Sequence, residues 1–187
     1  MGIFIKLAEY GFFCDTIIRW GIRKLLAARL AAITNDSITD KEWITRLEGG
    51  SLAVQTEAAN SQHYEIPASY FSSVLGIHVK YSSGFWPDTG TSLNESEAIM
   101  LQLTCERAEL KDGQRILELG CGWGSLSLWM ATHYPKSTIV AISNSHSQRA
   151  YIESKAQERG LNNLRVLTCD INEYYPEGTF DRVVSIE

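Results

Sequence analysis

Apolar and polar residues follow two different rhythms in the second half of the chain. Four short apolar runs predict β-strands, and longer stretches with helical spacing lie between the first three runs. Near-continuous apolar strands that alternate with helices are typical of a parallel sheet that is covered on both faces. We therefore expect an α/β fold. The predicted strands are 114–119, 138–142, 164–168 and 181–186, and the predicted helices are 125–134 and 146–159.

The first half of the chain has helical patterns only. Apolar side chains three or four positions apart over residues 3–33 predict a helix with a break near Gly11 or Gly21. Two capping boxes, each a Ser or Thr with Glu three residues later, predict two more helix starts. A loop rich in aromatic and turn-forming residues is expected over 80–88. The further predicted helices run from Thr39 to Gly49, over 67–75, and from Ser92 to about Leu110.

Composition and charge exclude several classes of protein. The chain has 187 residues, of which 44% are hydrophobic and 21% charged, so it is neither disordered nor collagen-like. Its net charge of −5 argues against a general nucleic-acid binder. The four cysteines form no C-x-x-C pair, which predicts free thiols and no metal site. With no secretory signal pattern after Met1, a cytoplasmic protein is expected.

The charge is unevenly spread, which marks the N-terminal segment as a separate unit. Residues 1–33 carry a net charge of +3, and the remainder carries −8. This basic segment contains Trp20 and is compatible with contact to a membrane surface. Packing on its own domain or on a partner chain is the commoner role of such a helix. We expect three parts: a helical arm or cap over 1–60, a helical cap with the aromatic loop over 61–110, and a sheet domain over 111–187.

A glycine-rich turn follows the first predicted strand. It reads Gly120-Cys121-Gly122-Trp123-Gly124, with Glu118 two residues before it, and a helix begins directly afterwards. Glycines at alternate positions let the backbone approach a ligand closely. A dinucleotide fingerprint needs a differently placed third glycine and an acidic residue after the second strand, where this chain has Ser143-Asn144. These hydroxyl and amide groups, with Gln148, are candidates for hydrogen bonds to ribose hydroxyls instead.

Six motifs together resemble one superfamily of class I S-adenosylmethionine (SAM) methyltransferases. It is the superfamily of cyclopropane-fatty-acyl-phospholipid synthases and coclaurine-type N-methyltransferases, and the resemblance covers about residues 60–187. It implies a Rossmann-like parallel sheet, of which the chain holds the first four strands. The motifs are Gln62-His63-Tyr64-Glu65-Ile66-Pro67, Tyr81-Ser82-Ser83-Gly84, Cys105-Glu106-Arg107-Ala108, the glycine turn, Ser143-Asn144-Ser145 with Gln148, and Ser185-Ile186-Glu187.

The resemblance implies SAM as the cofactor and assigns residues to its parts. In this superfamily the Tyr-Ser pair holds the methionine part, the glycine turn holds the carboxylate end, and the segment after the third strand holds the adenine. The acidic residue before the turn assists at the amino group. Carried over to this chain, the residues are Tyr81 and Ser82, Gly120 and Gly122, Asp170 with Ile171, and Glu118.

Two departures separate the branches of the superfamily. Cyclopropane synthases have a cysteine that helps to bind bicarbonate where this chain has Ser83, and a glycine where it has Glu187. Coclaurine-type enzymes have a glutamate at the second place, so the resemblance favours methylation of a small amine, with Glu187 as the catalytic residue. A lipid-modifying enzyme of the cyclopropane synthase type and an inactive SAM-binding module stay as alternatives. The oligomeric state is open.

The number of predicted strands bears on the length of the chain. The superfamily has seven strands, and the sequence predicts only four, ending on the strand that carries Glu187. We therefore expect a C-terminally truncated chain that is less stable and much less active than a complete one.

Overall fold

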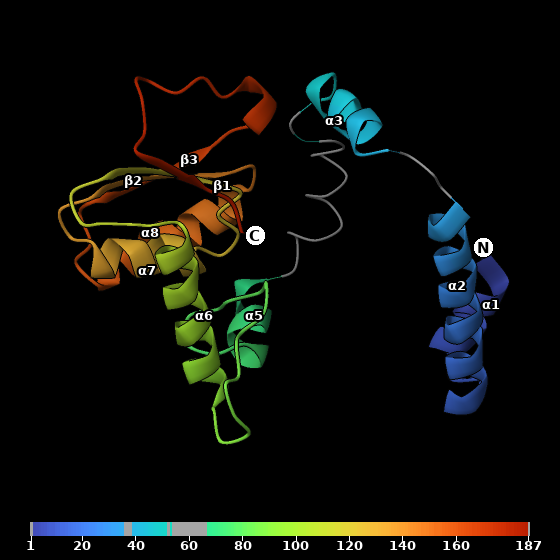
Figure 1. The fold of residues 1–187 in the computed structure, drawn as a ribbon. Helices are drawn as coiled ribbons and strands as arrows, with labels where there is room; N and C mark the ends of the chain where they lie inside the picture. Colours follow the sequence, from blue (N-terminus) through green and yellow to red (C-terminus); the bar gives the residue numbers. More distant parts are fainter. Residues whose placement is uncertain (1, 36–38, 52, 54–66, 187) are drawn as a thin grey trace. The chain divides into compact units, whose positions relative to one another are not determined.

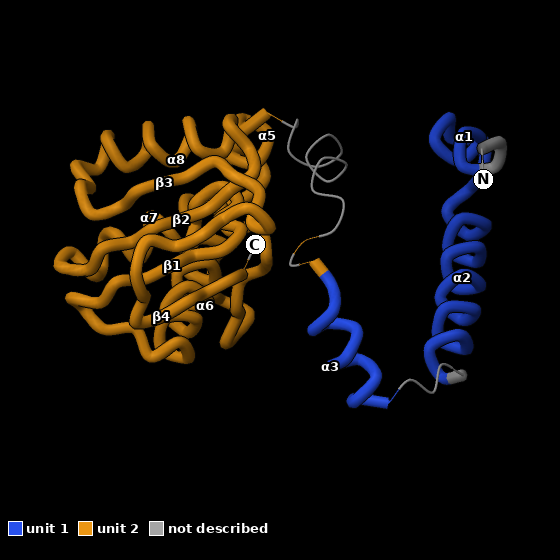
Figure 2. Tube along the Cα trace, turned by 90° about the horizontal axis from the view of Figure 1, so that it is seen from above, with its two compact units in different colours: residues 1–50 blue, residues 51–187 orange. Residues whose placement is uncertain are grey.

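The computed structural model describes residues 2–35, 39–51, 53 and 67–186 (Figure 1). The chain forms two compact units, residues 1–50 and residues 51–187 (Figure 2). The predicted boundaries at residues 60 and 110 remain predictions. Among the described residues, no helix is long and apolar enough to cross a membrane.

The first unit consists of helices. α1 (Gly2–Glu9) and α2 (Asp15–Asn35) are separated at Gly11, which has a φ of 74°. The predicted break therefore occurs at Gly11, and α2 continues through Gly21 without interruption. α3 (Asp40–Glu48) begins with the predicted capping box, in which the Thr39 backbone N–H donates to Glu42 Oε2 at 2.8 Å. Side-chain and backbone groups thus satisfy each other at the start of α3.

The second unit contains the predicted parallel sheet. Its strands are β1 (Arg115–Leu119), β2 (Thr138–Ser143), β3 (Leu164–Thr168) and β4 (Arg182–Val184). They lie in the order β3-β2-β1-β4, and all pairs are parallel. The register pairs Leu119 with Ile142 and Ser143 with Thr168, so the carboxyl ends of β1, β2 and β3 share one edge. The structure confirms the predicted α/β fold with four strands after N-terminal helices.

Helices cover one face of this sheet. α6 (Leu93–Arg107), α7 (Ser125–His133) and α8 (His146–Glu158) lie on the same side in Figure 1, and α5 (Ala68–Val74) contacts α8. The strand residues on this face form the core with the helices. The buried residues of this core include Leu101, Cys105, Ile116, Leu126, Leu128, Met130, Ile139, Ala141, Ile152, Val166 and Val184.

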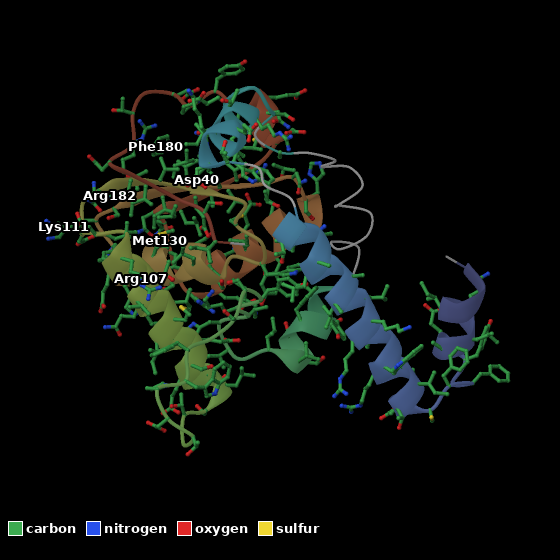
Figure 3. All side chains as sticks on the ribbon, turned by 45° about the vertical axis from the view of Figure 1, so that its right-hand side comes forward. Asp40, Arg107, Lys111, Met130, Phe180 and Arg182 are labelled. Atoms are coloured by element: carbon green, nitrogen blue, oxygen red, sulfur yellow. The ribbon has the colours of Figure 1, made fainter. Side chains whose placement is uncertain are left out.

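The other face is covered by the segment after β3, so the sheet is covered on both faces, as the alternating pattern predicted. This segment includes a short 3-10 helix, η2 (Ile171–Glu173), and Phe180 packs near the buried strand residues Leu117 and Val140. Figure 3 labels Met130 and Phe180 on opposite faces of the sheet. The Arg115 guanidinium lies 4.4 Å from the centre of the Phe180 ring, which fixes the segment against β1.

Two elements are shorter than predicted. α6 ends at Arg107 because Glu109 adopts a left-handed φ of 52°, which lets the N–H of Leu110 donate back to the Cys105 carbonyl at 3.0 Å. β4 begins after Asp181, whose carboxylate accepts the Arg115 N–H at 2.7 Å. Local backbone bonds therefore end α6 early, and the Asp181 side chain pairs with Arg115 just before β4 begins.

Candidate functional site

The glycine turn joins the carboxyl end of β1 to α7. Gly120, Gly122 and Gly124 have φ values of 69°, 52° and 79°, a region in which other residues are strained. The N–H of Cys121 donates to the Ile142 carbonyl at 2.9 Å, which fastens the turn to the end of β2. The turn therefore brings bare backbone to the edge where ligands of open parallel sheets bind.

Glu118 lies buried beneath this turn. Its side chain is on the helix-facing side of β1, and its Oε2 atom accepts a hydrogen bond from the Ser127 hydroxyl of α7. This hydrogen bond joins the end of β1 to α7, the two elements that the glycine turn connects. Sequence reasoning did not identify Ser127. The available signal was a hydroxyl side chain among mainly apolar residues of the predicted helix.

Ser143 and Gln148 form a buried polar pair at the end of β2. The Ser143 hydroxyl donates to Gln148 Oε1 at 2.6 Å and accepts the Ser145 N–H at 3.0 Å. Gln148 is only 2% exposed, and its Nε2 atom has no hydrogen-bond partner among the described residues. Whichever way round the amide lies, one of its two polar atoms lacks a partner. Asn144, which follows Ser143, is half-buried at the same strand end.

Asp170 begins η2 after β3. Its Oδ1 atom accepts the backbone N–H of Asn172 at 2.8 Å and the Asn172 side-chain amide at 2.9 Å. Asn172 also exchanges two hydrogen bonds with the backbone of Ala53, at 3.0 and 3.1 Å. Ile171 packs with the apolar residues of the second sheet face. The loop that holds Asp170 and Ile171 is therefore anchored on both sides.

The thiol beside Asp170 has a raised pKa. Burial, followed by the charges of Asp170 and Glu173, raises the pKa of Cys169. The Cys169 N–H donates to the Ser143 carbonyl at 3.0 Å, so this residue has a structural place between the ends of β2 and β3.

Aromatic rings connect the Tyr81-Ser82 segment to the glycine turn. The ring centres of Tyr81 and Phe71 are 5.5 Å apart, and those of Phe71 and Trp123 are 5.3 Å apart. Trp123 belongs to the glycine turn and also meets Tyr151 of α8 edge to face, at 5.5 Å. The structure thus brings two distant motifs together through Phe71, which sequence reasoning missed because one aromatic residue in a short helix carries no special signal.

The remaining predicted site residues differ in how far the structure describes them. The Ser82 hydroxyl accepts a hydrogen bond from the buried Lys80 ammonium. Just beyond β4, the Ser185 hydroxyl donates to the Leu119 carbonyl at 2.9 Å, which ties the end of β4 to the end of β1. Glu187 lies outside the described residues, as does the motif over 62–66.

Comparisons with known proteins show which family the chain resembles in sequence and fold. The family model of mycolic acid cyclopropane synthetase matches residues 53–187. (S)-Coclaurine N-methyltransferase of Thalictrum flavum subsp. glaucum is 33% identical over 170 residues, which are 91% of this chain and 45% of that protein. Cyclopropane-fatty-acyl-phospholipid synthase of Escherichia coli K12 is 33% identical over 127 residues, which are 67% of this chain and 31% of that protein.

A solved structure extends the similarity to the fold. The crystal structure of coclaurine N-methyltransferase bound to N-methylheliamine and SAH matches with a TM-score of 0.83 at 34% identity, over 97% of this chain and 54% of that chain. The chain spans about half the length of the coclaurine-type relatives that it matches. It belongs to the mycolic acid cyclopropane synthetase family of SAM-dependent methyltransferases.

Proposed function

We propose that this chain forms the SAM-binding part of a methyltransferase that methylates the nitrogen of a small amine. One observation supports the cofactor assignment: among the residues that the structure describes, one polar atom of the buried Gln148 amide next to Ser143 has no partner, at the sheet edge beside the glycine turn. An unmet buried hydrogen-bonding group costs about 1–3 kcal/mol. A ribose hydroxyl would offset that cost, so the residues fit SAM.

The other candidate residues have matching chemistry. Gly120 and Gly122 expose backbone at the strand edge, which suits a carboxylate, and Tyr81 offers an aromatic face to a cation. Asp170 and Ile171 lie after β3, where an adenine would contact one polar and one apolar side chain. When bound, SAM supplies an electrophilic methyl group on a sulfonium. The chain's residues have to orient both reactants and exclude water.

The amine acceptor is supported by two positions in the sequence. Ser83 stands where cyclopropane synthases have a bicarbonate-binding cysteine, and Glu187 stands where they have glycine. An amine is protonated near neutral pH and must lose a proton before it attacks. We propose that the Glu187 carboxylate holds the substrate ammonium and accepts its proton. Ser185, two residues earlier, is already fixed to the end of β1.

Calorimetry with SAM tests the cofactor. The Asp170→Asn variant keeps a side chain that can begin η2, whereas Asp170→Ala removes it together with the carboxylate. We expect SAM to bind the wild type, and both variants to bind it more weakly. Unchanged SAM affinity in both variants would refute the adenine assignment, and no binding to the wild type would refute the proposed function.

A product assay tests the acceptor, with the protein expressed from its complete reading frame. SAM is supplied with coclaurine in one reaction and with vesicles of unsaturated phospholipid in the other. We expect a methylated amine, and we expect Glu187→Gln to slow its formation without weakening SAM binding. A modified lipid would favour the cyclopropane synthase alternative. SAM binding without either product would favour the inactive module.

A further inference from the structure

The segment over residues 76–85 has a backbone that its own sequence does not favour. Val79 and Ser83 have φ values of 51° and 103°, and neither is glycine. Left-handed backbone is especially unfavourable for a β-branched residue such as Val79. Tyr81 and Ser82, the residues proposed to hold the methionine part of SAM, lie between these two positions. Their placement must therefore be imposed by surrounding structure.

A buried carboxylate of α6 organises the first part of this segment. Glu97 is 1% exposed, and its two oxygens accept three backbone N–H groups. Oε1 accepts from Gly76 at 2.8 Å and from Lys80 at 3.3 Å, and Oε2 accepts from His78 at 3.0 Å. The donors are alternate residues, so the backbone curls around the carboxylate as it does around a bound anion.

The same helix holds the segment at two further points. Asn94 Oδ1 accepts the Ile77 N–H at 2.9 Å, and the Ser96 carbonyl accepts the Phe85 N–H at 2.9 Å. Gly76 lies so close to Glu97 that a Cβ atom added at Gly76 would be only 2.7 Å from Glu97 Oε2. Hydrogen bonds to the N-terminal half of α6 thus hold the segment that carries Tyr81 and Ser82 in place.

We propose that Glu97 is a positioning residue for cofactor binding. Its carboxylate fixes the curl over 76–80 and thereby sets Tyr81 and Ser82 at the aromatic junction with Phe71 and the glycine turn. A carboxylate suits this place because both of its oxygens are acceptors, and the three described groups that donate to it are backbone N–H groups. This inference rests on the proposed function in one respect, the role of Tyr81 and Ser82 toward SAM.

Glu97→Gln tests the proposal with little change in shape. The new side-chain NH₂ group faces a backbone N–H, so at least one of the three hydrogen bonds is lost. Gly76→Ala disturbs the same contact from the other side and serves if Glu97→Gln does not fold. The matched control is Glu95→Gln, which removes an equal charge two residues before Glu97. The Glu95 carboxylate is exposed and accepts the Ser92 N–H at 2.8 Å.

The protein expressed from its complete reading frame is assayed by SAM calorimetry, steady-state kinetics and amide hydrogen exchange. We expect the Kd and KM for SAM to rise about tenfold in Glu97→Gln and in Gly76→Ala, with kcat at saturating SAM within about twofold of wild type. We also expect faster exchange of the amides over 76–80. Glu95→Gln should leave SAM affinity and this exchange unchanged.

Two results would overturn the proposal. One is wild-type SAM affinity in Glu97→Gln while exchange over 76–80 is faster, because the curl would then be irrelevant to the cofactor. The other is unchanged exchange in both Glu97→Gln and Gly76→Ala, because Glu97 would then not hold the segment. Absence of SAM binding by the wild type would instead refute the proposed function. In that case the exchange of the amides over 76–80 would still show whether Glu97 holds the segment.

Discussion

Gly124, the last glycine of the turn, is a position where the structure permits no side chain, and the cost of adding one divides into two parts. Its φ of 79° is left-handed, and a Cβ atom there would lie 2.5 Å from Ile152 Cγ1. Left-handed backbone costs a non-glycine residue about 1–2 kcal/mol. Overpacking in a core costs a further 1–3 kcal/mol or so. We therefore expect Gly124→Ala to lower the free energy of unfolding by about 2–5 kcal/mol.

Two variants separate these parts. Gly160 has a φ of 67° and open space around the Cβ position, so Gly160→Ala reports the backbone cost alone, about 1–2 kcal/mol. Ile152→Ala removes the atoms that the new Cβ would meet. In the Gly124→Ala, Ile152→Ala double variant, the two losses should be less than additive, with a coupling of about 1–3 kcal/mol.

Urea unfolding at equilibrium measures the wild type and the four variants, because the midpoint and slope together give the free energy of unfolding. If Gly124→Ala costs no more than Gly160→Ala, the steric part of the reasoning is wrong. Additive losses in the double variant would show that Ile152 is not the obstacle. A changed slope would point to an altered native or denatured state and would have to be resolved before the free energies are compared.

Three further predictions concern buried polar and titratable groups. Ser127→Ala removes a donor to the buried Glu118 carboxylate and should lower the free energy of unfolding by about 1–3 kcal/mol in urea titrations; a loss below about 0.3 kcal/mol would contradict the importance of this bond. Burial lowers the pKa of His78 from 6.5, so below about pH 6.5 the unfolded chain binds more protons than the folded chain. The free energy of unfolding therefore decreases as the pH falls below about 6.5. The fall in Tm from about pH 7.5 to about pH 5.5 should therefore be smaller in His78→Gln, and an unchanged fall would refute this source of pH dependence. Burial raises the pKa of the Cys105 thiol to about 11, whereas Cys14 is exposed; iodoacetamide at about pH 8, followed by mass spectrometry, should label Cys14 and leave Cys105 intact unless the protein is unfolded first.

Regular elements were predictable because their signals are local. The run around Ile139 is apolar at successive positions, and its strand lies within one residue of the prediction. The Thr39 and Ser92 capping boxes gave two helix starts correctly, because both partners of each box lie within four residues. The glycine turn was equally clear, since alternate glycines directly follow a strand.

The support of the candidate site was not predictable, because it depends on partners that are distant in the chain. Glu97 gives no local sign that it accepts three N–H groups from a segment about twenty residues earlier. The left-handed backbone of Val79 has no glycine to announce it. Phe71 looks like an ordinary core residue until its ring is seen beside Trp123. Sequence reasoning identified candidate ligand-binding residues and missed those that hold them in place.

The strand order has a consequence for the route by which the sheet assembles. Paired residues of β1 and β2 are 23 positions apart, as in Ile116 and Ile139, whereas β1 and β4 pair Ile116 with Arg182, 66 positions away. Closing the longer loop costs about 0.9 kcal/mol more in chain entropy. Only three residue pairs between β1 and β4 offset this cost. Of the four described strands, we expect β4 to dock last. The cofactor edge would then be built before the strand that leads to Glu187, so the proposed substrate side would form only after β1, β2 and β3 have paired.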